Sequence, residues 1–294
     1  MISTKAARAV AAVIQTGSFE IAATQLGLTP SAVSHRVKLL EDQLGTILIR
    51  RSSPCTATPA GEKVHVYLQT IALLERELTR DLGIHSTDRV TVRIAVNADS
   101  LGTWFMSALA QNSDEFLFDV IIEDQEVTSE LLKSGEVVGA LGMKEHTIAG
   151  CDELYLGNMP YVPCASPAFI AKHFPHGVSK SSLLSAPSLR FSPHDHLQDK
   201  WVAQYIEKNI RLPIHKLPSF SVFIDGCLTG LGWGMLPKET VAPYLADKRL
   251  ALLRENAELD TQLVWRWLRS ASKALAPLNQ AIRSSAKQTL KPNN

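Results

Sequence analysis

The sequence predicts an α/β protein in which a small helical module precedes a larger domain of alternating strands and helices. In residues 1–45 the apolar side chains recur at helical spacing, which is typical of short amphipathic helices. Residues 59–82 carry apolar side chains at intervals of three and four, the spacing of a helix that packs against another helix. From residue 89 onward, β-branched runs alternate with helical segments, which indicates a mostly parallel sheet.

Length and composition exclude several classes of protein. The chain has 294 residues, enough for about two domains at roughly 150 residues each. Its 30 Lys and Arg against 29 Asp and Glu exclude a uniformly basic nucleic-acid coat, although a small basic module remains compatible. Four cysteines, none in a C-x-x-C pair, favour a reducing compartment. Because no apolar run approaches the roughly 18 residues of a membrane span and the amino terminus lacks a signal-peptide pattern, we expect a cytoplasmic protein without a membrane partner.

The first three elements follow the order of a helix-turn-helix. A helix is expected over residues 4–15, and Ser18 is a ready N-cap for a second, short helix. Thr29 caps a third helix over residues 30–44, which begins with a proline whose missing N–H costs nothing there. Two helices joined by a short turn containing glycine form the helix-turn-helix pattern, in which the second helix of the pair enters the DNA major groove.

A two-stranded wing is expected after the third helix. Residues 47–51 predict a strand with two arginines, residues 52–54 turn the chain, and residues 55–58 return. Arginines on such a wing would lie along the phosphate backbone. A helical hairpin with a β-turn and no nucleic-acid role is the alternative that the pattern leaves open. The residues expected to contact DNA are Ser31, Ser34, His35, Arg36, Lys38, Arg50 and Arg51.

This segment closely resembles the DNA-binding module of LysR-type transcriptional regulators. Residues 18–23, 28–41 and 44–45 carry the resemblance, and residues 58–61 match the family's junction between wing and linker. His35 stands where many members carry glutamine, which leaves the module intact and bears on its half-site preference. The resemblance implies a winged helix-turn-helix domain and a transcription regulator rather than an enzyme.

A linker helix that pairs with a second copy is expected next. It extends over residues 59–85 and follows a module, residues 1–58, that is too small to cover it. An ordinary amphipathic helix packed on its own domain is the alternative. The family resemblance implies a dimerising helix, so that a homodimer or homotetramer presents paired recognition helices to a pseudo-palindromic site on double-stranded DNA. The expected seam comprises Val64, Tyr67, Ile71, Leu74, Leu78 and Leu82.

Residues 86–294 comprise the predicted α/β domain. In open α/β sheets, ligands bind beyond the carboxyl ends of strands, often at the start of a helix. The first strand is expected to end at residue 96, which makes residues 97–100 the strongest candidate site; an ordinary N-cap is the alternative. Further strands are expected near 118–122, 137–143, 188–191, 214, 233–236 and 260–268, and helices near 127–133, 196–209, 223–229 and 272–287.

The same domain resembles the ArgP/LysG branch of the LysR-type family, also described as IciA-like. Residues 95–101, 135–140, 174–178 and 231–237 carry this resemblance. Members of the branch sense lysine or arginine and control genes for basic amino-acid export. The resemblance therefore implies a small-molecule effector, lysine or arginine, and a role in amino-acid export or metabolism.

The resemblance also implies a two-lobed effector domain like a periplasmic binding protein, with the ligand in the cleft between the lobes. On this analogy the first lobe covers about residues 89–161 and 267–294, and the second about 162–266. Cys164 and residues 220–226 depart from the branch where the cleft is expected, so a different effector remains an alternative.

A basic amino acid makes two chemical demands on its site. Its α-carboxylate needs hydrogen-bond donors, and its side-chain cation needs a carboxylate or an aromatic face. Each acidic candidate is also compatible with an ordinary surface charge. The residues expected to contact the effector are Asn97, Ser100 and Thr128 at the carboxylate, Asp99, Glu123, Asp124 and Asp225 at the cation, and Cys164 at the start of the second lobe.

The remaining motifs predict no catalysis, cofactor or metal. Because G-x-S-x-G, H-E-x-x-H, a Walker A loop and a strand-linked G-x-G-x-x-G are missing, we expect no enzyme activity and no cofactor. His194 and His196 flank an aspartate without a third ligand nearby, which is a weak metal signal. The cysteines lack the paired spacing of LysR-type peroxide sensors, and redox input is kept as an alternative. The alternative from another class is a small-molecule binding protein or an enzyme with an amino-terminal protein-interaction module, and RNA polymerase is the further partner considered.

Overall fold

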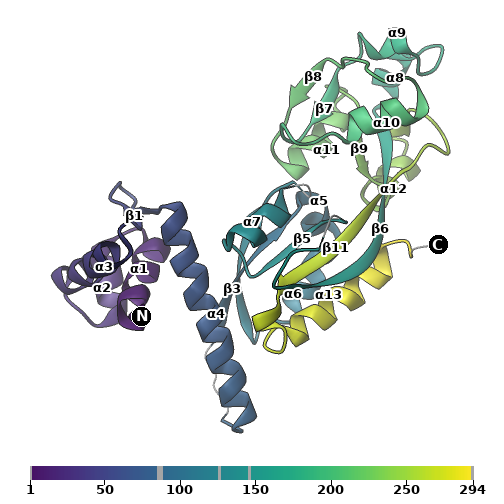
Figure 1. Ribbon diagram of the computed structural model, residues 1–294. Coiled ribbons are helices and arrows are strands. Elements are labelled where there is room, and N and C mark those ends of the chain that lie inside the picture. Colours follow the sequence, from purple (N-terminus) through teal and green to yellow (C-terminus); the bar gives the residue numbers. More distant parts are fainter. Residues whose placement is uncertain (1, 85–88, 125–126, 145–146, 293–294) are drawn as a thin grey trace.

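The computed structural model of the chain describes residues 2–84, 89–124, 127–144 and 147–292. Figure 1 shows a small helical module at the N-terminus, the long helix α4 beside it, and an α/β body of two lobes. The boundary expected between residues 85 and 86 lies outside the described residues. Within the described ranges, no helix is both long and apolar enough to cross a membrane.

The module begins with short helices whose ends are set by local sequence. They are α1 (Thr4–Thr16), α2 (Phe19–Leu26) and α3 (Pro30–Leu44), each followed by a glycine with a left-handed backbone. The Ser18 side chain accepts hydrogen bonds from free N–H groups at the start of α2, and Thr29 does the same for α3. The expected helix-turn-helix, including both caps, is confirmed.

The core of the module lies between these helices. Val10, Val33 and Leu40 are fully buried there, as the apolar spacing predicts. Leu44 continues the apolar spacing of α3 but is 39% exposed, because α3 ends at this residue and the chain turns away at Gly45. The buried face of α3 is therefore shorter than its apolar pattern.

The wing is shorter than expected. Its strands β1 (Ile49–Arg50) and β2 (Thr56–Ala57) pair antiparallel over two residues each. The Glu41 carboxylate accepts the backbone N–H groups of Leu48 at 2.8 Å and Ile49 at 3.3 Å, so α3 satisfies these groups in place of a longer strand ladder. This contact also fixes the base of the wing against the helix that carries the candidate DNA contacts.

Helix α4 (Pro59–Asp81) belongs to two cores at once. Thr58 caps the helix by accepting a backbone N–H at 3.1 Å. Val64 is buried in the core of the module, whereas Val66 and Leu73 are buried in the core of the body. The helix therefore packs both on the module and on the body.

Most of the expected dimer seam lies on the exposed side of α4. Val64 is the exception, because it turns into the module, and Ile71 is half-buried. The other members form an apolar strip that stays exposed in the single chain. They are Tyr67 (42% exposed), Leu74 (44%), Leu78 (59%) and Leu82 (64%).

The body is built on a sheet with the strand order β10-β6-β11-β5-β3-β4, in which β9 also pairs with β6. In lobe I, the lobe beside α4, β3 (Val90–Val96) runs parallel to β4 (Phe116–Ile122) and β5 (Gly139–Met143). β11 (Leu259–Leu268) is antiparallel to both of its neighbours, β5 and β6 (Cys151–Ala165). The expectation of a mostly parallel sheet is therefore wrong, because β11 brings the chain back from the second lobe and runs against the strands that left.

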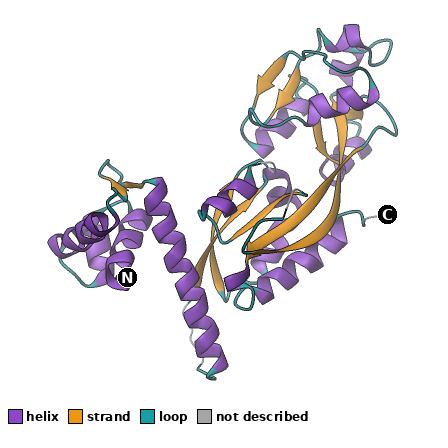
Figure 2. Ribbon diagram, in the orientation of Figure 1, coloured by secondary structure: helices purple, strands orange, loops and turns teal. Residues whose placement is uncertain are grey.

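Two of the described strands, β6 and β11, connect the lobes, and Figure 2 shows them running from one lobe into the other. Tyr161 of β6 pairs with Leu259 at the start of β11. Beyond this point β6 pairs with β9 (Gly234–Pro237) and β10 (Ala251–Leu252) of lobe II. The chain therefore re-enters lobe I near Leu259 and not near residue 267, and β6 itself is not among the expected strands.

Helices cover both faces of the lobe I sheet (Figure 1). A continuous helix follows β3 and comprises α5 (Ala98–Ser100), a π-helical turn (η1, Leu101–Phe105) and α6 (Met106–Ala110). It packs with α13 (Ala276–Thr289) on one face, whereas α7 (Thr128–Ser134) covers the other. Because the continuous helix starts directly after β3, its first residues sit at the carboxyl edge of the sheet.

Lobe II packs its helices around a small parallel pair of strands. Trp201 and Trp233 are fully buried in this lobe, with their ring centroids 5.7 Å apart. The elements of lobe II are α8 (Pro167–His173), α9 (Lys180–Leu183), β7 (Ser188–Arg190), α10 (Leu197–Tyr205), β8 (Ile214–Lys216), α11 (Phe220–Leu228) and α12 (Lys238–Ala246), and the short helix η2 (Arg269–Ala271) follows β11 in lobe I.

Candidate ligand pocket and nucleic-acid interface

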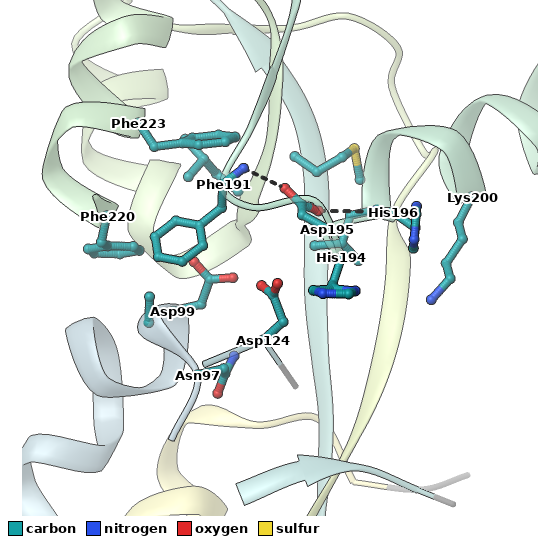
Figure 3. A pocket seen from close by; sticks show the side chains of 14 residues that line it. Asn97, Asp99, Asp124, Phe191, His194, Asp195, His196, Lys200, Phe220 and Phe223 are labelled. Atoms are coloured by element: carbon teal, nitrogen blue, oxygen red, sulfur yellow. Dashed lines mark hydrogen bonds between the residues drawn. The ribbon is translucent and has the colours of Figure 1, made fainter. Parts of the chain in front are cut away.

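A pocket lies between the two lobes, at the carboxyl edge of the lobe I sheet (Figure 3). Its empty volume is about 620 Å³, including the open mouth. Lobe I contributes the start of α5 and the segment after β4, and lobe II contributes α10 with the loop before it, α11 and β9. The lining residues are Asn97, Ala98, Asp99, Asp124, Phe191, His194, Asp195, His196, Leu197, Lys200, Phe220, Phe223, Met235 and Leu236.

Asp99 is a carboxyl group whose charge the pocket stabilises poorly. It accepts a hydrogen bond at 2.7 Å from the hydroxyl of Tyr161, on a strand that joins the lobes. The pKa of Asp99 is raised to about 7, first by burial and then by the charges of Asp195 and Asp124, while the bond from Tyr161 opposes the rise. The free pocket therefore holds a carboxyl group that exchanges its proton near neutral pH.

Asp124 and Asp195 bring two further carboxylates to the same space. Ser192 of lobe II donates a hydrogen bond to Asp124 of lobe I, so this pair also links the lobes. Asp195 accepts the backbone N–H groups of Phe191 at 2.9 Å and Leu197 at 3.2 Å. Burial raises the pKa of Asp195, these hydrogen bonds lower it, and the charge of Asp124 adds to the rise. The three carboxyl groups give the centre of the pocket an acidic character.

Aromatic rings and basic side chains complete the walls. Figure 3 shows the rings of Phe191, Phe220 and Phe223 on the lobe II side, next to the carboxyl groups. His196 and Lys200 lie on the α10 side of the same pocket. The pocket therefore offers carboxylates to a cation, apolar faces to a hydrocarbon stem and basic groups to an anion.

Asn97 and Ser100, at the start of the continuous helix, each contain a buried oxygen atom that no described residue pairs with. Both residues are almost fully buried, and neither Asn97 Oδ1 nor Ser100 Oγ has a hydrogen-bond partner among the residues that the structure describes. A buried polar atom left unpaired costs about 1–3 kcal/mol. Because Asn97 lines the pocket, a ligand bound there can supply its missing partner.

The structure brings together three of the eight residues expected to contact the effector, namely Asn97, Asp99 and Asp124. Ser100 is fully buried and does not line the pocket. Glu123 is half-buried and also lies outside the lining, although it directly precedes Asp124. The strand-end rule therefore predicts the edge of the sheet at which the pocket lies, but not every side chain that lines the pocket.

The other three expected contacts lie outside the lining of the pocket. Thr128 donates its hydroxyl to a β5 carbonyl at 2.8 Å, which ties α7 to the sheet. Cys164 is fully buried in the lobe II core, beside Cys227. Asp225 is exposed on α11, because a helix turns by about 200° in the two residues that separate it from Phe223.

The segment after β7 contributes most of the pocket residues that the sequence does not predict. Phe191, His194, Asp195, His196 and Lys200 all line the pocket, and none is among the expected contacts. One signal points to them, since they follow a predicted strand and ligands bind beyond strand ends. The described part of the chain contains no group of three or more His, Cys, Asp or Glu side chains suited to a metal ion.

The candidate nucleic-acid interface comprises the outward face of α3 and the adjoining wing. The residues expected to contact DNA on this face are polar or basic and can bond to base edges or phosphates. The seven expected DNA contacts lie on these two elements. Ser31, His35, Lys38, Arg50 and Arg51 are exposed, and Ser34 and Arg36 are half-buried.

Arg51 is held against α3 rather than extended from the wing. Its guanidinium carbon lies 4.9 Å from the centre of the Phe19 ring, and its Nη2 donates to Ser34 Oγ at 3.5 Å. These contacts place a positive charge between α2 and α3. Arg51 is therefore positioned to meet a phosphate beside the groove that α3 would enter.

Comparison with known protein families matches both regions of the chain. Residues 4–62 match the family described as "Bacterial regulatory helix-turn-helix protein, lysR family". Residues 85–287 match the family described as "LysR substrate binding domain". The two matches follow one another along the chain and cover the module and the body.

Named relatives are similar over nearly the whole chain. The HTH-type transcriptional regulator LysG of Mycobacterium tuberculosis is 38% identical over 279 residues, which cover 95% of this chain and 91% of the relative. The HTH-type transcriptional regulator ArgP of Pseudomonas fluorescens is 36% identical over 296 residues, which cover 99% of each protein.

Solved structures show the same similarity. ArgP from Mycobacterium tuberculosis has a TM-score of 0.80 at 36% identity, with 100% of both chains covered. Full-length LysG from Corynebacterium glutamicum with bound effector Arg has a TM-score of 0.67 at 31% identity, with 99% of this chain and 100% of that chain covered.

Proposed function

We propose that this chain, which belongs to the LysR family of bacterial transcriptional regulators, binds promoter DNA as a homo-oligomer and responds to lysine or arginine in its inter-lobe pocket. The chain is a regulator of the ArgP and LysG type, so the family excludes the alternative of an enzyme or a simple binding protein. On this proposal, the genes under its control serve amino-acid export or metabolism.

The observation that carries the effector proposal is the convergence of Asp99, Asp124 and Asp195 in one pocket. Burial and the charges of the other two groups oppose the ionisation of Asp99, whose pKa is about 7. A ligand cation removes this opposition and allows all three groups to ionise together. A neutral amino acid of the same shape offers no such compensation.

The other walls suit the remaining parts of a basic amino acid. Lys200 and His196 can receive its α-carboxylate, and the phenylalanine rings can cover its methylene stem. The unpartnered oxygen of Asn97 suits an ammonium or guanidinium donor. The bound effector Arg in the solved LysG relative supports the same ligand class.

The cysteines do not favour redox input as the alternative signal. A hydrogen bond with Cys227 and burial raise the pKa of Cys164 well above its ordinary value. Because the thiolate is the reactive form, this environment makes Cys164 a poor target for oxidants. The acidic pocket is therefore the better-supported sensor.

The exposed strip of α4 supports the oligomeric part of the proposal. Tyr67, Leu74, Leu78 and Leu82 form an exposed apolar seam on a helix that already packs on the module and on lobe I with two other faces. A second α4 packed on this seam would bury the apolar side chains that a single chain leaves exposed. The resulting dimer would place two α3 helices on one DNA duplex.

Calorimetric titration of the full-length protein with L-arginine and L-lysine tests the effector. L-citrulline is the matched ligand control, because it keeps the shape of arginine and loses its charge. We expect at least one basic amino acid to bind at least about tenfold more tightly than citrulline, since a hydrogen bond to a charged group contributes about 1.5–3 kcal/mol. Equal binding of citrulline, or no binding of either basic amino acid, would overturn the proposed effector.

A pair of variants tests the location of the effector. Asp124→Asn removes a carboxylate that lines the pocket, and Asp225→Asn makes the same change on the exposed face of α11. We expect the first variant to weaken binding of the basic amino acid about tenfold and the second to bind like the unmodified protein. The reverse pattern would place the ligand elsewhere.

A further inference from the structure

Helix α4 is attached to lobe I by a partly buried ion pair at the middle of β3. The guanidinium of Arg93 pairs with Glu62, near the start of α4, and with Asp119 of β4 at 3.2 Å. The side chains of Arg93 and Glu62 are 17% and 22% exposed, so solvent screens this pair less than a surface pair. One side chain of lobe I therefore contacts the end of α4 that lies next to the wing.

A second contact joins the backbone of β3 to a side chain of α4. The N–H of Arg93 donates to Gln69 Oε1 at 3.2 Å, and Gln69 Nε2 lies 3.0 Å from His65 Nε2. Gln69 is 5% exposed and His65 is 3% exposed. Because a buried polar group left without a partner costs about 1–3 kcal/mol, α4 cannot slide or turn on β3 without a penalty.

Glu62, Gln69 and Arg93, called the α4 joint below, form the part of a longer contact that lies next to the wing. Arg76 and Arg80 also reach Glu115 of lobe I, at 3.4 and 3.3 Å, and Lys273 reaches Asp81 at 2.5 Å. Arg80, Asp81 and Lys273 are largely exposed, so the pairs that they form contribute little at physiological salt. The α4 joint therefore fixes the half of the helix that follows the wing, and Arg76, which is 15% exposed, holds the far half.

The position of the α4 joint places it between the two candidate sites. β3 carries Arg93 and ends at Val96, directly before Asn97 of the pocket, which lies four residues or about 13 Å beyond Arg93. Glu62 lies in the first turn of α4, directly after the wing. The path from the pocket to the DNA-binding module therefore consists of β3, its direct contact with α4, and α4 itself.

We propose that the α4 joint couples the effector pocket to DNA binding by making lobe I, α4 and the helical module turn as one body when lobe II moves. This inference rests on the proposed function, because it requires an effector in the inter-lobe pocket. Arg93 and Gln69 are positioning residues, since neither lines the pocket and neither is among the residues expected to contact DNA.

The first test needs no effector and measures hydrogen exchange at the backbone amides of residues 62–73. Arg93→Met keeps the hydrocarbon stem and removes the charge, and Gln69→Leu removes the bond to the strand. Arg254→Met is the matched control, because exposed Arg254 donates to the carbonyl of Tyr205 at 2.7 Å in lobe II rather than in the lobe that carries α4. We expect exchange about tenfold faster in the two joint variants and unchanged in the control. Equal protection in all proteins would overturn the α4 joint.

The second test measures the coupling itself. The affinity for a promoter fragment is measured by fluorescence anisotropy with and without saturating L-arginine, and binding of L-arginine is measured by calorimetry. We expect Arg93→Met to bind L-arginine within about twofold of the unmodified protein but to lose most of the arginine-dependent change in DNA affinity. Arg93→Lys, which keeps the charge, should restore part of the response, whereas a folding defect would not be rescued in this way.

The outcomes separate this inference from the proposed function. A full response to L-arginine in Arg93→Met would overturn the coupling role of the α4 joint. If the unmodified protein does not bind L-arginine or L-lysine, the proposed effector fails, and the hydrogen-exchange result alone decides whether α4 is locked to lobe I.

Discussion

Binding of a basic amino acid should weaken as the pH falls from 8 to 6, because a proton competes with the ligand for Asp99. Burial and two neighbouring carboxylates raise the pKa of this group to about 7 in the free pocket. A cation bound against Asp99 requires its ionised form. With one competing proton at this pKa, the Kd should rise about tenfold between pH 8 and pH 6.

The stability of the free protein should also depend on the ionisation of Asp99, but it should fall as the pH rises, whereas ligand binding strengthens. Because the pKa of Asp99 is raised from 3.8 to about 7, folding loses stability as the pH rises through this range. The full loss, above pH 7, is at most about 4 kcal/mol, since each pKa unit corresponds to about 1.4 kcal/mol. Asp99→Asn removes the charge and keeps an oxygen that can accept from Tyr161. The variant should melt several degrees higher at pH 8, and the gain should vanish near pH 4.

Calorimetry in two buffers of different ionisation enthalpy measures the proton directly. At pH 7 we expect release of roughly half a proton for each basic amino acid bound. Asp225→Asn should follow the unmodified protein throughout, because its carboxylate is exposed and lies outside the pocket. A Kd that stays flat between pH 6 and pH 8, or an Asp99→Asn variant with no gain in melting temperature at pH 8, would refute the role of Asp99.

Three further predictions concern other elements. Arg51→Met should weaken promoter binding about tenfold and lower the slope of log affinity against log salt by about one in anisotropy titrations; an unchanged slope would remove Arg51 from the interface. Gly102→Ala places a Cβ 2.5 Å from the ring of Phe220, across the lobes, so calorimetry should show effector affinity reduced about fivefold with DNA binding intact. Leu78→Glu should dissociate the oligomer in sedimentation velocity, and an unchanged mass would contradict the α4 seam.

The helical module could be predicted almost to the residue because its signals are local. Ser18, Thr29 and Thr58 each cap a helix by accepting an N–H group two or three residues further on. The expected strand at residues 47–51 is too long, because Glu41 binds the backbone there from another element. Local patterns thus predict the structure correctly except where a distant side chain accepts the backbone N–H groups that a longer strand would use.

β6 could not be predicted because its stabilising partners are distant in the chain. Gly157, Pro160 and Pro163 interrupt the pattern of residues 151–165, and proline normally argues against a strand inside a sheet. In the structure these positions are held by pairing with β11 on one stretch and β9 on the next. β6 is therefore stabilised in both lobes by strands that come later in the chain.

Only the lobe I side of the candidate pocket could be predicted, because the lobe II side depends on contacts between distant parts of the chain. Asn97 and Asp99 follow a clear strand in lobe I, so the strand-end rule finds them. Asp195 and Lys200 reach the pocket only because β6 and β11 bring lobe II over this edge. The distance between the two half-sites is set by the crossing strands, which no local pattern reveals.

Helix α4 is amphipathic and offers apolar side chains to three neighbours, which are the module, lobe I and a second copy of the chain. Its spacing predicts a single seam for a partner, yet Val64 packs in the module and Leu73 in lobe I. Two faces are therefore committed within the chain, and the strip that includes Leu78 is the face left for a second copy. In a dimer built on that strip, a turn of lobe I that carries α4 with it must change the angle between the two α3 helices. The α4 joint thereby links closure of the pocket to the spacing that the DNA has to match.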